Sequence, residues 1–247
     1  MVATARKIRA TFFNIIPSAV VTQALASAGA DAIVIDQEHA PVGPENLHAM
    51  IASTAGTNCL PLVRITKRDE AMVKLALDLG AAGIVFPLTN TAEEAAECVA
   101  MTRYPPHGRR GFGPFVAHSR WGRTFDESLT HLSDNARCSL LIETKAAIDN
   151  IEAICAVPGI STMVLARLDL SVDMGCPGRF DAPEFLAATE KFERVAKAAK
   201  IPMSALALTP EEVKSAVARG YSSVLLGYDV LMLKNAATTA MGWLDHG

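Results

Sequence analysis

The chain has 247 residues, half of them hydrophobic and a fifth charged, with a formal net charge of −3. This composition is ordinary for a well-packed enzyme, and the charge excludes the basic surface that nucleic acid or an acidic membrane would require. We expect neither a transmembrane helix nor a signal peptide, because no window holds the roughly 18 uncharged apolar residues that a span needs and the N-terminal apolar stretch is short.

Eight short apolar runs alternate with helical patterns along the chain. Their length and β-branching are typical of buried strands, which we expect at residues 9–16, 32–35, 60–64, 83–87, 139–143, 162–166, 202–206 and 223–227. Helices are expected at residues 19–28, 45–53, 70–79, 92–102, 146–155, 183–199, 210–218 and 230–244. Asn90-Thr91 and Thr209 stand at N-cap positions, with glutamates in the first helical turns.

This alternation of strands and helices predicts an α/β fold, a single (β/α)8 barrel (TIM barrel). About 250 residues is the usual length of one such barrel, so we expect residues 1–247 to form one domain. An open, doubly wound sheet is the alternative, but the sequence contains no GxGxxG motif or P-loop to support it.

The five cysteines are scattered and odd in number, and no two of them form a CxxC motif. This pattern indicates reduced and mostly buried thiols. We therefore expect a cytoplasmic protein without a disulfide framework.

The strand expected at residues 32–35 ends at a polar cluster, Asp36, Glu38 and His39. Unpaired polar groups are costly in an apolar interior, so the cluster should lie where the strand leaves the core. Pro44 then opens the next helix. Two interpretations stay open: the strand exit is where α/β folds keep their chemistry, or the carboxylates cap the turn and His39 is a surface histidine.

The longest irregular stretch runs from residue 104 to residue 126, with two prolines in tandem and several glycines and arginines. A long ordered loop in a compact barrel is usually functional. We expect it to cover the substrate or to contact another subunit, and a solvated connector is the remaining alternative.

In a barrel, active residues belong at the C-terminal ends of the strands. The candidates there come from four strands: Glu38 and His39 after the second, Arg64 ending the third, Glu143 ending the fifth and Asp169 after the sixth. Two acidic side chains suit Mg²⁺ or Mn²⁺, an arginine suits a keto-acid oxygen, and a histidine is the usual proton shuttle. The alternative is that the two acidic residues merely cap the next helices.

Over nearly its whole length the sequence resembles the HpcH/HpaI family of class II, metal-dependent pyruvate aldolases, which act on 4-hydroxy-2-oxo acids and 2-keto-3-deoxy sugar acids. The segments that carry the resemblance are IDQEHAP (35–41), LVRITKRDEAMVKLALDLGA (62–81), RYPPHGRRGFG (103–113), SRW (119–121), LIETKAA (141–147) and LDLSVDMG (168–175). The resemblance implies a barrel of the phosphoenolpyruvate/pyruvate superfamily, a bound divalent metal (Mg²⁺, Mn²⁺ or Co²⁺) and a homo-oligomer, usually a hexamer built as a trimer of dimers.

The resemblance also implies roles for single residues. Glu143 and Asp169 match the two metal ligands, and Arg64 matches the arginine that touches the pyruvate oxygens. His39 matches the catalytic histidine, and Asp78 matches the aspartate that pairs with it. The metal and Arg64 would together stabilise the negative charge on the enolate oxygen.

The chain departs from the family pattern in two places. Leu141 stands where many relatives have a glutamine, and Ala166-Arg167-Leu168 stands where they have Gly-Pro-Ala. A guanidinium so close to a metal ligand needs an anionic partner, which is either Asp173 or a carboxylate or phosphate on the substrate. We expect four residues to bind the substrate: Arg64, Arg167, Leu168 and Asp169.

The sequence thus predicts a metal-dependent carbon–carbon lyase. It would cleave a 4-hydroxy-2-oxo acid to pyruvate and an aldehyde through a metal-stabilised pyruvate enolate, and run in reverse as an aldol addition. Asp36 and Glu38 would support the loop and the waters of the metal. Two alternatives remain: a related metal-enolate lyase such as an oxaloacetate decarboxylase, or a barrel that binds an acidic metabolite without turnover.

Overall fold

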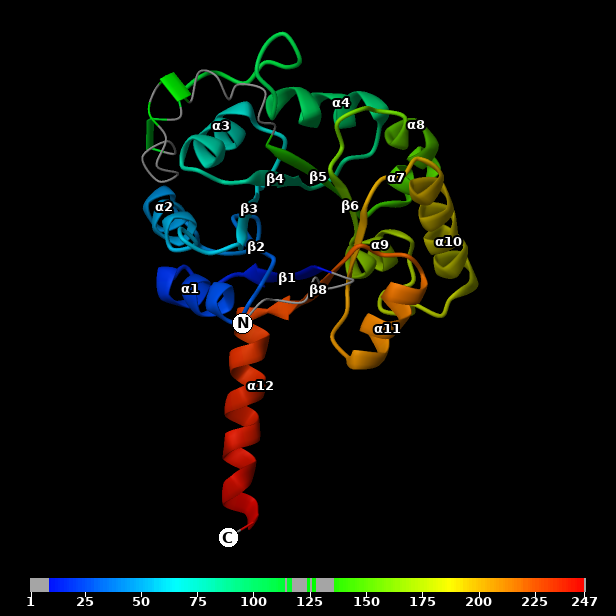
Figure 1. Ribbon diagram of the computed structural model, residues 1–247. Coiled ribbons are helices and arrows are strands. Elements are labelled where there is room, and N and C mark those ends of the chain that lie inside the picture. Colours follow the sequence, from blue (N-terminus) through cyan, green and yellow to red (C-terminus); the bar gives the residue numbers. More distant parts are fainter. Residues whose placement is uncertain (1–8, 114, 117–123, 125, 128–135, 247) are drawn as a thin grey trace.

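The predicted strands form a closed parallel barrel, in which each strand pairs with the next along the chain and the last pairs with the first (Figure 1). A computed structural model describes residues 9–113, 115–116, 124, 126–127 and 136–246. The (β/α)8 prediction is confirmed, and no strand end differs from its expected place by more than two residues. The strands are β1 (Arg9–Asn14), β2 (Ala32–Asp36), β3 (Leu60–Arg64), β4 (Gly83–Phe86), β5 (Arg137–Ile142), β6 (Thr162–Leu165), β7 (Met203–Leu206) and β8 (Ser223–Tyr228).

Helices surround the barrel, and two of their features differ from the expectation. One helix was expected over residues 146–155, but the structure has two that meet at Asn150, whose side chain donates to the carbonyl oxygen of Asn90 at 2.9 Å. A short extra helix, α9, follows β6. The helices are α1 (Ala19–Ser27), α2 (Pro44–Ala52), α3 (Glu70–Asp78), α4 (Ala92–Met101), α7 (Lys145–Asp149), α8 (Ile151–Cys155), α9 (Arg167–Asp173), α10 (Pro183–Ala198), α11 (Pro210–Ala218) and α12 (Asp229–Met241), followed by the 3₁₀ turn η1 (Gly242–His246).

The predicted N-caps are present and set where several helices start. Thr91 and Glu94 form a reciprocal capping box at α4, and the Thr209 hydroxyl accepts from the backbone N–H of Glu212 at α11. Such caps satisfy backbone donors that the first turn leaves unpaired. They fix the helix starts at the C-terminal end of the barrel, which is the mouth where the polar residues gather.

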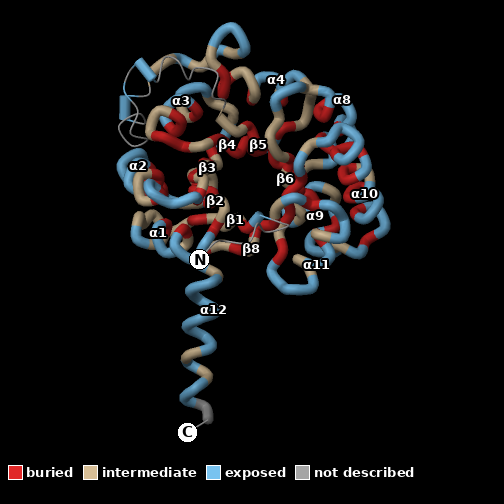
Figure 2. The backbone as a smooth tube through the Cα atoms, viewed as in Figure 1, coloured by how far each residue is buried: buried red, intermediate tan, exposed pale blue. Residues whose placement is uncertain are grey.

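The strands of the barrel are mostly buried (Figure 2), and two apolar layers hold the barrel together. Outside the strands, fully buried side chains such as Phe86 and Phe192 pack between barrel and helices, and each contributes about 1.5–3 kcal/mol by burial. The five cysteines are free and buried. Inside the barrel a second cluster lies below the mouth and closes it from beneath: Phe13, Val34, Leu62, Val85, Leu141 and Val164.

Two arginines of the long loop pair with acidic residues of helix α3. Arg109 pairs with Glu70 at 3.3 Å, and Arg110 pairs with Asp78 at 3.1 Å. Residues 104–113 therefore lie against α3, and none of them lines the mouth cavity. That the loop covers the substrate stays a prediction. Contact with another subunit stays a prediction, and residues 114, 117–123 and 125 lie outside the described part.

Helix α12 runs away from the barrel (Figure 1) and is exposed along most of its length (Figure 2). Apolar side chains on it and on η1 face solvent, with Leu233 63% and Trp243 72% exposed. No helix in the described ranges combines the length and apolar character that crossing a membrane requires.

Candidate active site

A cavity of about 340 Å³ opens at the C-terminal end of the barrel. Four of the predicted site residues line it, namely Glu38, His39, Glu143 and Asp169. They come from the ends of β2 and β5 and from the start of α9, which are far apart in sequence. The remaining lining residues are Leu88, Thr144, Val172 and Asp173.

Three carboxylates repel one another in this cavity. Burial raises the pKa of Glu143, the N–H of Leu88 opposes that rise, and the charges of Glu38 and Asp169 add to it. Burial also raises the pKa of Glu38, and Arg64 opposes it. Such a group of carboxylates is stabilised by a cation, because an opposite charge favours the ionised forms.

The donor set fits a hard divalent cation that keeps part of its hydration shell. In the described part of the chain, no three histidine, cysteine, aspartate or glutamate side chains are arranged to hold a metal by themselves. Mg²⁺ is usually bound through one or two carboxylates and retains several waters. Glu143 and Asp169 supply such a pair, so the residues present fit the predicted metal.

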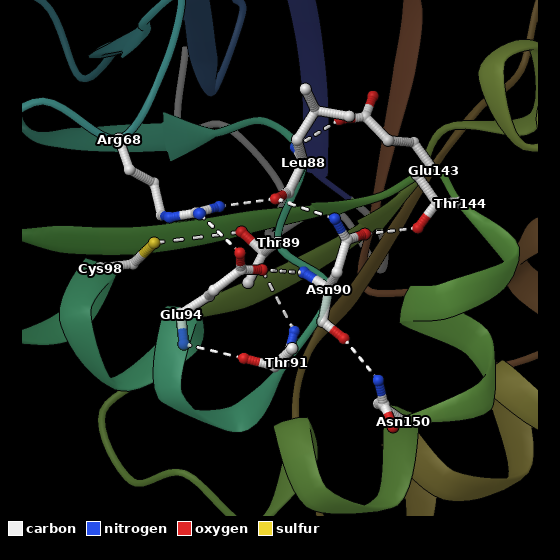
Figure 3. Close-up of polar contacts among 10 residues, drawn as sticks. All are labelled: Arg68, Leu88, Thr89, Asn90, Thr91, Glu94, Cys98, Glu143, Thr144 and Asn150. Atoms are coloured by element: carbon white, nitrogen blue, oxygen red, sulfur yellow. Dashed lines mark hydrogen bonds and ion pairs between the residues drawn. The ribbon is translucent and has the colours of Figure 1, made fainter.

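A backbone donor holds Glu143 in place (Figure 3). The N–H of Leu88, just after β4, donates to Oε1 of Glu143 at 2.5 Å. Leu88 has a φ of +50°, in the left-handed region, which costs a leucine on the order of 1 kcal/mol. Strained backbone of this kind concentrates at functional sites, where the surrounding contacts maintain it.

Arg64 is held by three neighbours, one of which, Glu38, lines the cavity. Its Nε donates to Oδ1 of Asp36 at 2.9 Å and its Nη2 donates to Oδ2 at 2.8 Å. Its Nη1 lies 3.0 Å from Glu38, and its guanidinium carbon lies 4.5 Å from the centre of the Phe13 ring. An arginine has five N–H donors, so donors on both terminal nitrogens remain for a substrate oxygen.

His39 lies at the rim of the cavity, with 69% of its side chain exposed and Nε2 3.8 Å from Glu38. Within this chain His39 lies near Glu38 and Asp78 pairs with Arg110, so the pairing of His39 with Asp78 that the resemblance implies stays a prediction. Helix α3 starts at the mouth and Asp78 ends it, about 12 Å further along at 1.5 Å per residue. Asp78 instead accepts a hydrogen bond from Arg110 at 3.1 Å.

Arg167 has an internal anionic partner, as predicted, but the partner is not Asp173. Its Nη1 lies 3.3 Å from Oε1 of Glu212, and its guanidinium carbon lies 4.2 Å from the centre of the Phe180 ring. Asp173 accepts a hydrogen bond from the backbone N–H of Lys145 instead. The predicted contact between Arg167 and an acidic substrate group is untested, and the engagement of the guanidinium by Glu212 and Phe180 argues against it.

Leu168 and Leu141, which also belong to the two departures, lie outside the lining of the mouth cavity. Leu168 is 56% exposed on α9. It does not line the mouth cavity, whereas Asp169 and Val172 on the same helix do. Leu141 is buried in the apolar layer inside the barrel, against Val34 and Val85. It forms part of the apolar floor below the mouth.

Sequence reasoning missed two contributors to this site. It assigned Asp36 to the support of the loop and of the metal waters, and Asp36 does accept a hydrogen bond from the N–H of Glu38 at 2.9 Å. It did not predict that the completely buried Asp36 also binds Arg64. It did not identify Leu88, because a leucine carries no sequence signal for a positive φ. The signal for Asp36 was present, since a carboxylate at the end of a buried strand requires a charged partner.

Proteins of known name resemble this chain over most of its length. Residues 9–236 match the model of the family described as HpcH/HpaI aldolase/citrate lyase. The chain is 31% identical over 231 residues to 2-keto-3-deoxy-L-rhamnonate aldolase of Escherichia coli (strain K12), an alignment that covers 93% of this chain and 86% of the relative.

Solved structures of related proteins have the same barrel. An HpcH/HpaI aldolase/citrate lyase family protein from Burkholderia cenocepacia J2315 has a TM-score of 0.90 at 26% identity, covering 97% of this chain and 95% of the other. Macrophomate synthase has a TM-score of 0.87 at 29% identity, covering 96% and 84%. The citrate lyase β subunit of M. tuberculosis, complexed with oxaloacetate and magnesium, has a TM-score of 0.59 at 16% identity, covers 90% and 92%, and shows the fold alone.

Proposed function

The chain belongs to the HpcH/HpaI aldolase/citrate lyase family, and from this premise we propose that it is a metal-dependent aldolase. Its relatives are named aldolases, so the chain is an enzyme of the aldehyde-lyase type. Its proposed substrate is a 4-hydroxy-2-oxo acid of the 2-keto-3-deoxy sugar-acid class. The products are pyruvate and an aldehyde.

The observation that carries this proposal is the meeting of Glu143, Asp169, Arg64 and His39 at one barrel mouth. Arg64 reaches that mouth through its ion pair with Glu38. When bound at Glu143 and Asp169, Mg²⁺ or Mn²⁺ would act as a Lewis acid towards the oxygens of a 2-oxo acid. Substrate binding, charge stabilisation and proton transfer would be carried out by side chains of this chain.

Arg64 would bind the 2-oxo acid and stabilise the charge that develops during bond breaking. When the bond between C3 and C4 breaks, its electron pair moves to the oxygen on C2. The free donors of Arg64 can bind that oxygen, and Asp36 keeps the guanidinium oriented. Preorganised donors aimed at developing charge are usually the largest contribution to catalysis.

His39 would move the proton. The reaction needs a base for the C4 hydroxyl proton, and C3 of the product needs a proton to become the methyl group of pyruvate. Nε2 of His39 lies at the rim, where it is exposed and 3.8 Å from Glu38. A histidine in that position can accept the first proton and return one later.

A related lyase on the same oxo-acid site is the second candidate, with oxaloacetate as the substrate. One assay separates the two functions: pyruvate release by the purified protein with Mn²⁺, from a 2-keto-3-deoxy sugar acid and from oxaloacetate. The proposal predicts a higher kcat/KM for the sugar acid. A higher value for oxaloacetate would favour the decarboxylase, and no release from either would favour the binding protein without turnover.

We also infer that the chain acts as a homo-oligomer, and the proposed form is the hexamer that the family resemblance implies. Val230 and Leu233 on helix α12 are exposed to solvent. Exposed apolar patches of this kind mark interaction surfaces. A cavity of about 360 Å³ lies over β1 and β8 between α1 and α11, with Phe12, Val224 and Leu226 in its lining. Helix α12 of a second copy, packed against this cavity, would bury both apolar surfaces.

A further inference from the structure

We propose that Arg68 is a positioning residue for Glu143, acting through the backbone of Leu88. The inference rests on the proposed function, because that function makes Glu143 a metal ligand. It concerns the turn after β4, residues 88–91, whose contacts are drawn in Figure 3. Arg68 lies on the neighbouring connection between β3 and α3 and has 23% of its side chain exposed.

Arg68 and Glu94 hold the two sides of this turn. Nη1 of Arg68 donates to the carbonyl oxygen of Leu88 at 2.6 Å, and Nη2 donates to Oε1 of Glu94 at 2.6 Å. The other oxygen of Glu94 accepts from the N–H of Asn90 at 2.6 Å and from that of Thr91 at 3.2 Å. The guanidinium thus ties the carbonyl of Leu88 to the start of α4.

The same turn is tied to the residue that follows Glu143. The hydroxyl of Thr144 donates to Oδ1 of Asn90 at 2.5 Å, while the N–H of Leu88 donates to Oε1 of Glu143 at 2.5 Å. Two consecutive residues after β5 therefore contact one turn after β4. Groups that orient a metal ligand in this way set its affinity for the metal.

The positive φ of Leu88 explains why the turn needs this support. A leucine favours negative φ, and a relaxed turn would rotate the N–H of Leu88 away from Glu143. Arg68 bonds the carbonyl of the same residue, so it opposes that rotation. If Arg68 served only its partly buried ion pair with Glu94, its loss would leave the affinity for Mn²⁺ unchanged, so the two cases predict different results.

The test is titration of metal-free protein with Mn²⁺ by calorimetry, without substrate. Arg68→Met should raise the Kd for Mn²⁺ by about 10- to 100-fold, as removal of an outer-shell partner does. Leu88→Gly keeps the N–H and favours positive φ, so its Kd should stay within about threefold of wild type. Leu88→Val should bind as weakly as Arg68→Met, because a β-branched residue disfavours positive φ. Arg194→Met removes a guanidinium from an exposed ion pair with Glu152 on the outside of the barrel and serves as the matched control.

Thermal unfolding of each variant, followed by circular dichroism, accompanies the titration. Wild-type affinity in both Arg68→Met and Leu88→Val would overturn the positioning role while leaving the proposed function intact. A wild-type protein that binds no Mn²⁺ would overturn the metal assignment and, with it, this inference. If Arg68→Met does not fold, Leu88→Val compared with Leu88→Gly decides the question, and equal affinity of those two would overturn the inference.

Discussion

Arg64 binds both carboxylate oxygens of Asp36, through Nε at 2.9 Å and Nη2 at 2.8 Å. A two-point contact of this kind fixes the plane of the guanidinium as well as its position. Asp36 is completely buried and only 12% of the Arg64 side chain is exposed. The pair therefore works as one unit, in which the carboxylate orients the arginine towards the mouth.

Arg64→Lys should lower kcat/KM by about 10²-fold, because an ammonium group cannot replace a planar fork of donors aimed at developing charge. The measurement is steady-state kinetics of pyruvate release. A loss confined to KM, with kcat unchanged, would mean that Arg64 binds substrate and transition state equally. Asp36→Asn is the companion variant and should lower the free energy of unfolding by about 3 kcal/mol, since it removes one partner of a buried pair.

His39→Ala should lower kcat by about 10²–10⁴-fold, the usual contribution of a positioned proton carrier. Its binding of Mn²⁺ should stay at the wild-type level, because Glu143 and Asp169 are unchanged. The measurement is exchange of the pyruvate methyl protons in D₂O by NMR. Exchange at the wild-type rate in the variant would exclude His39 from proton transfer at C3.

Arg167→Ala should lower kcat/KM for acidic and neutral acceptor aldehydes by the same factor. The guanidinium is already engaged by Glu212 and Phe180, so its loss should lower the free energy of unfolding by about 1 kcal/mol. The measurements are aldol addition kinetics with both aldehydes and denaturant unfolding. A loss limited to the acidic aldehyde would instead assign substrate recognition to Arg167.

Leu233→Glu should dissociate the oligomer, because it places a charge on the exposed apolar surface of α12. Lys234→Glu changes the charge of the adjacent exposed residue and is the matched control. Light scattering coupled to size-exclusion chromatography gives the mass of each variant. A monomeric wild-type protein, or an assembly of Leu233→Glu unchanged in mass, would contradict the inferred role of α12.

Much of the fold could be predicted because a parallel barrel buries its strands on both faces. Each strand then reads as a short apolar run, and the helix starts show as caps such as Thr91 and Thr209. Helix α9 was missed because its seven residues are too few for a helical period to show. The break at Asn150 depends on a contact with Asn90, 60 residues away, which local pattern does not contain.

The candidate site, like the fold, could be predicted only in part from the sequence. Which residues reach the mouth could be predicted, because strand ends determine it, and Glu143 and His39 both line the cavity. The partner with which each charged side chain pairs could not be predicted. Arg167 pairs with Glu212, on a helix 45 residues further along the chain, and not with the nearby Asp173. The choice of ion-pair partner depends on how distant helices pack against one another, and this packing cannot be inferred from the spacing of residues in the sequence.

Glu143 and Asp169 are the proposed metal ligands, and both line the mouth cavity. Glu143→Ala and Asp169→Ala should each remove most Mn²⁺ affinity and activity, and both variants should keep the wild-type circular dichroism spectrum. Both residues lie at the mouth cavity and not in the apolar layers that hold the barrel together. Wild-type activity in either variant would remove that residue from the metal site.

Pyruvate release from a 2-keto-3-deoxy sugar acid, measured before and after metal removal, tests the central claim most directly. The protein is treated with EDTA, the chelator is dialysed away, and the assay is run without metal and again with added Mn²⁺ or Mg²⁺. A metal-dependent aldolase built on Glu143 and Asp169 should lose pyruvate release with the metal and regain it when the metal is restored. Full release by the metal-free protein would contradict the account.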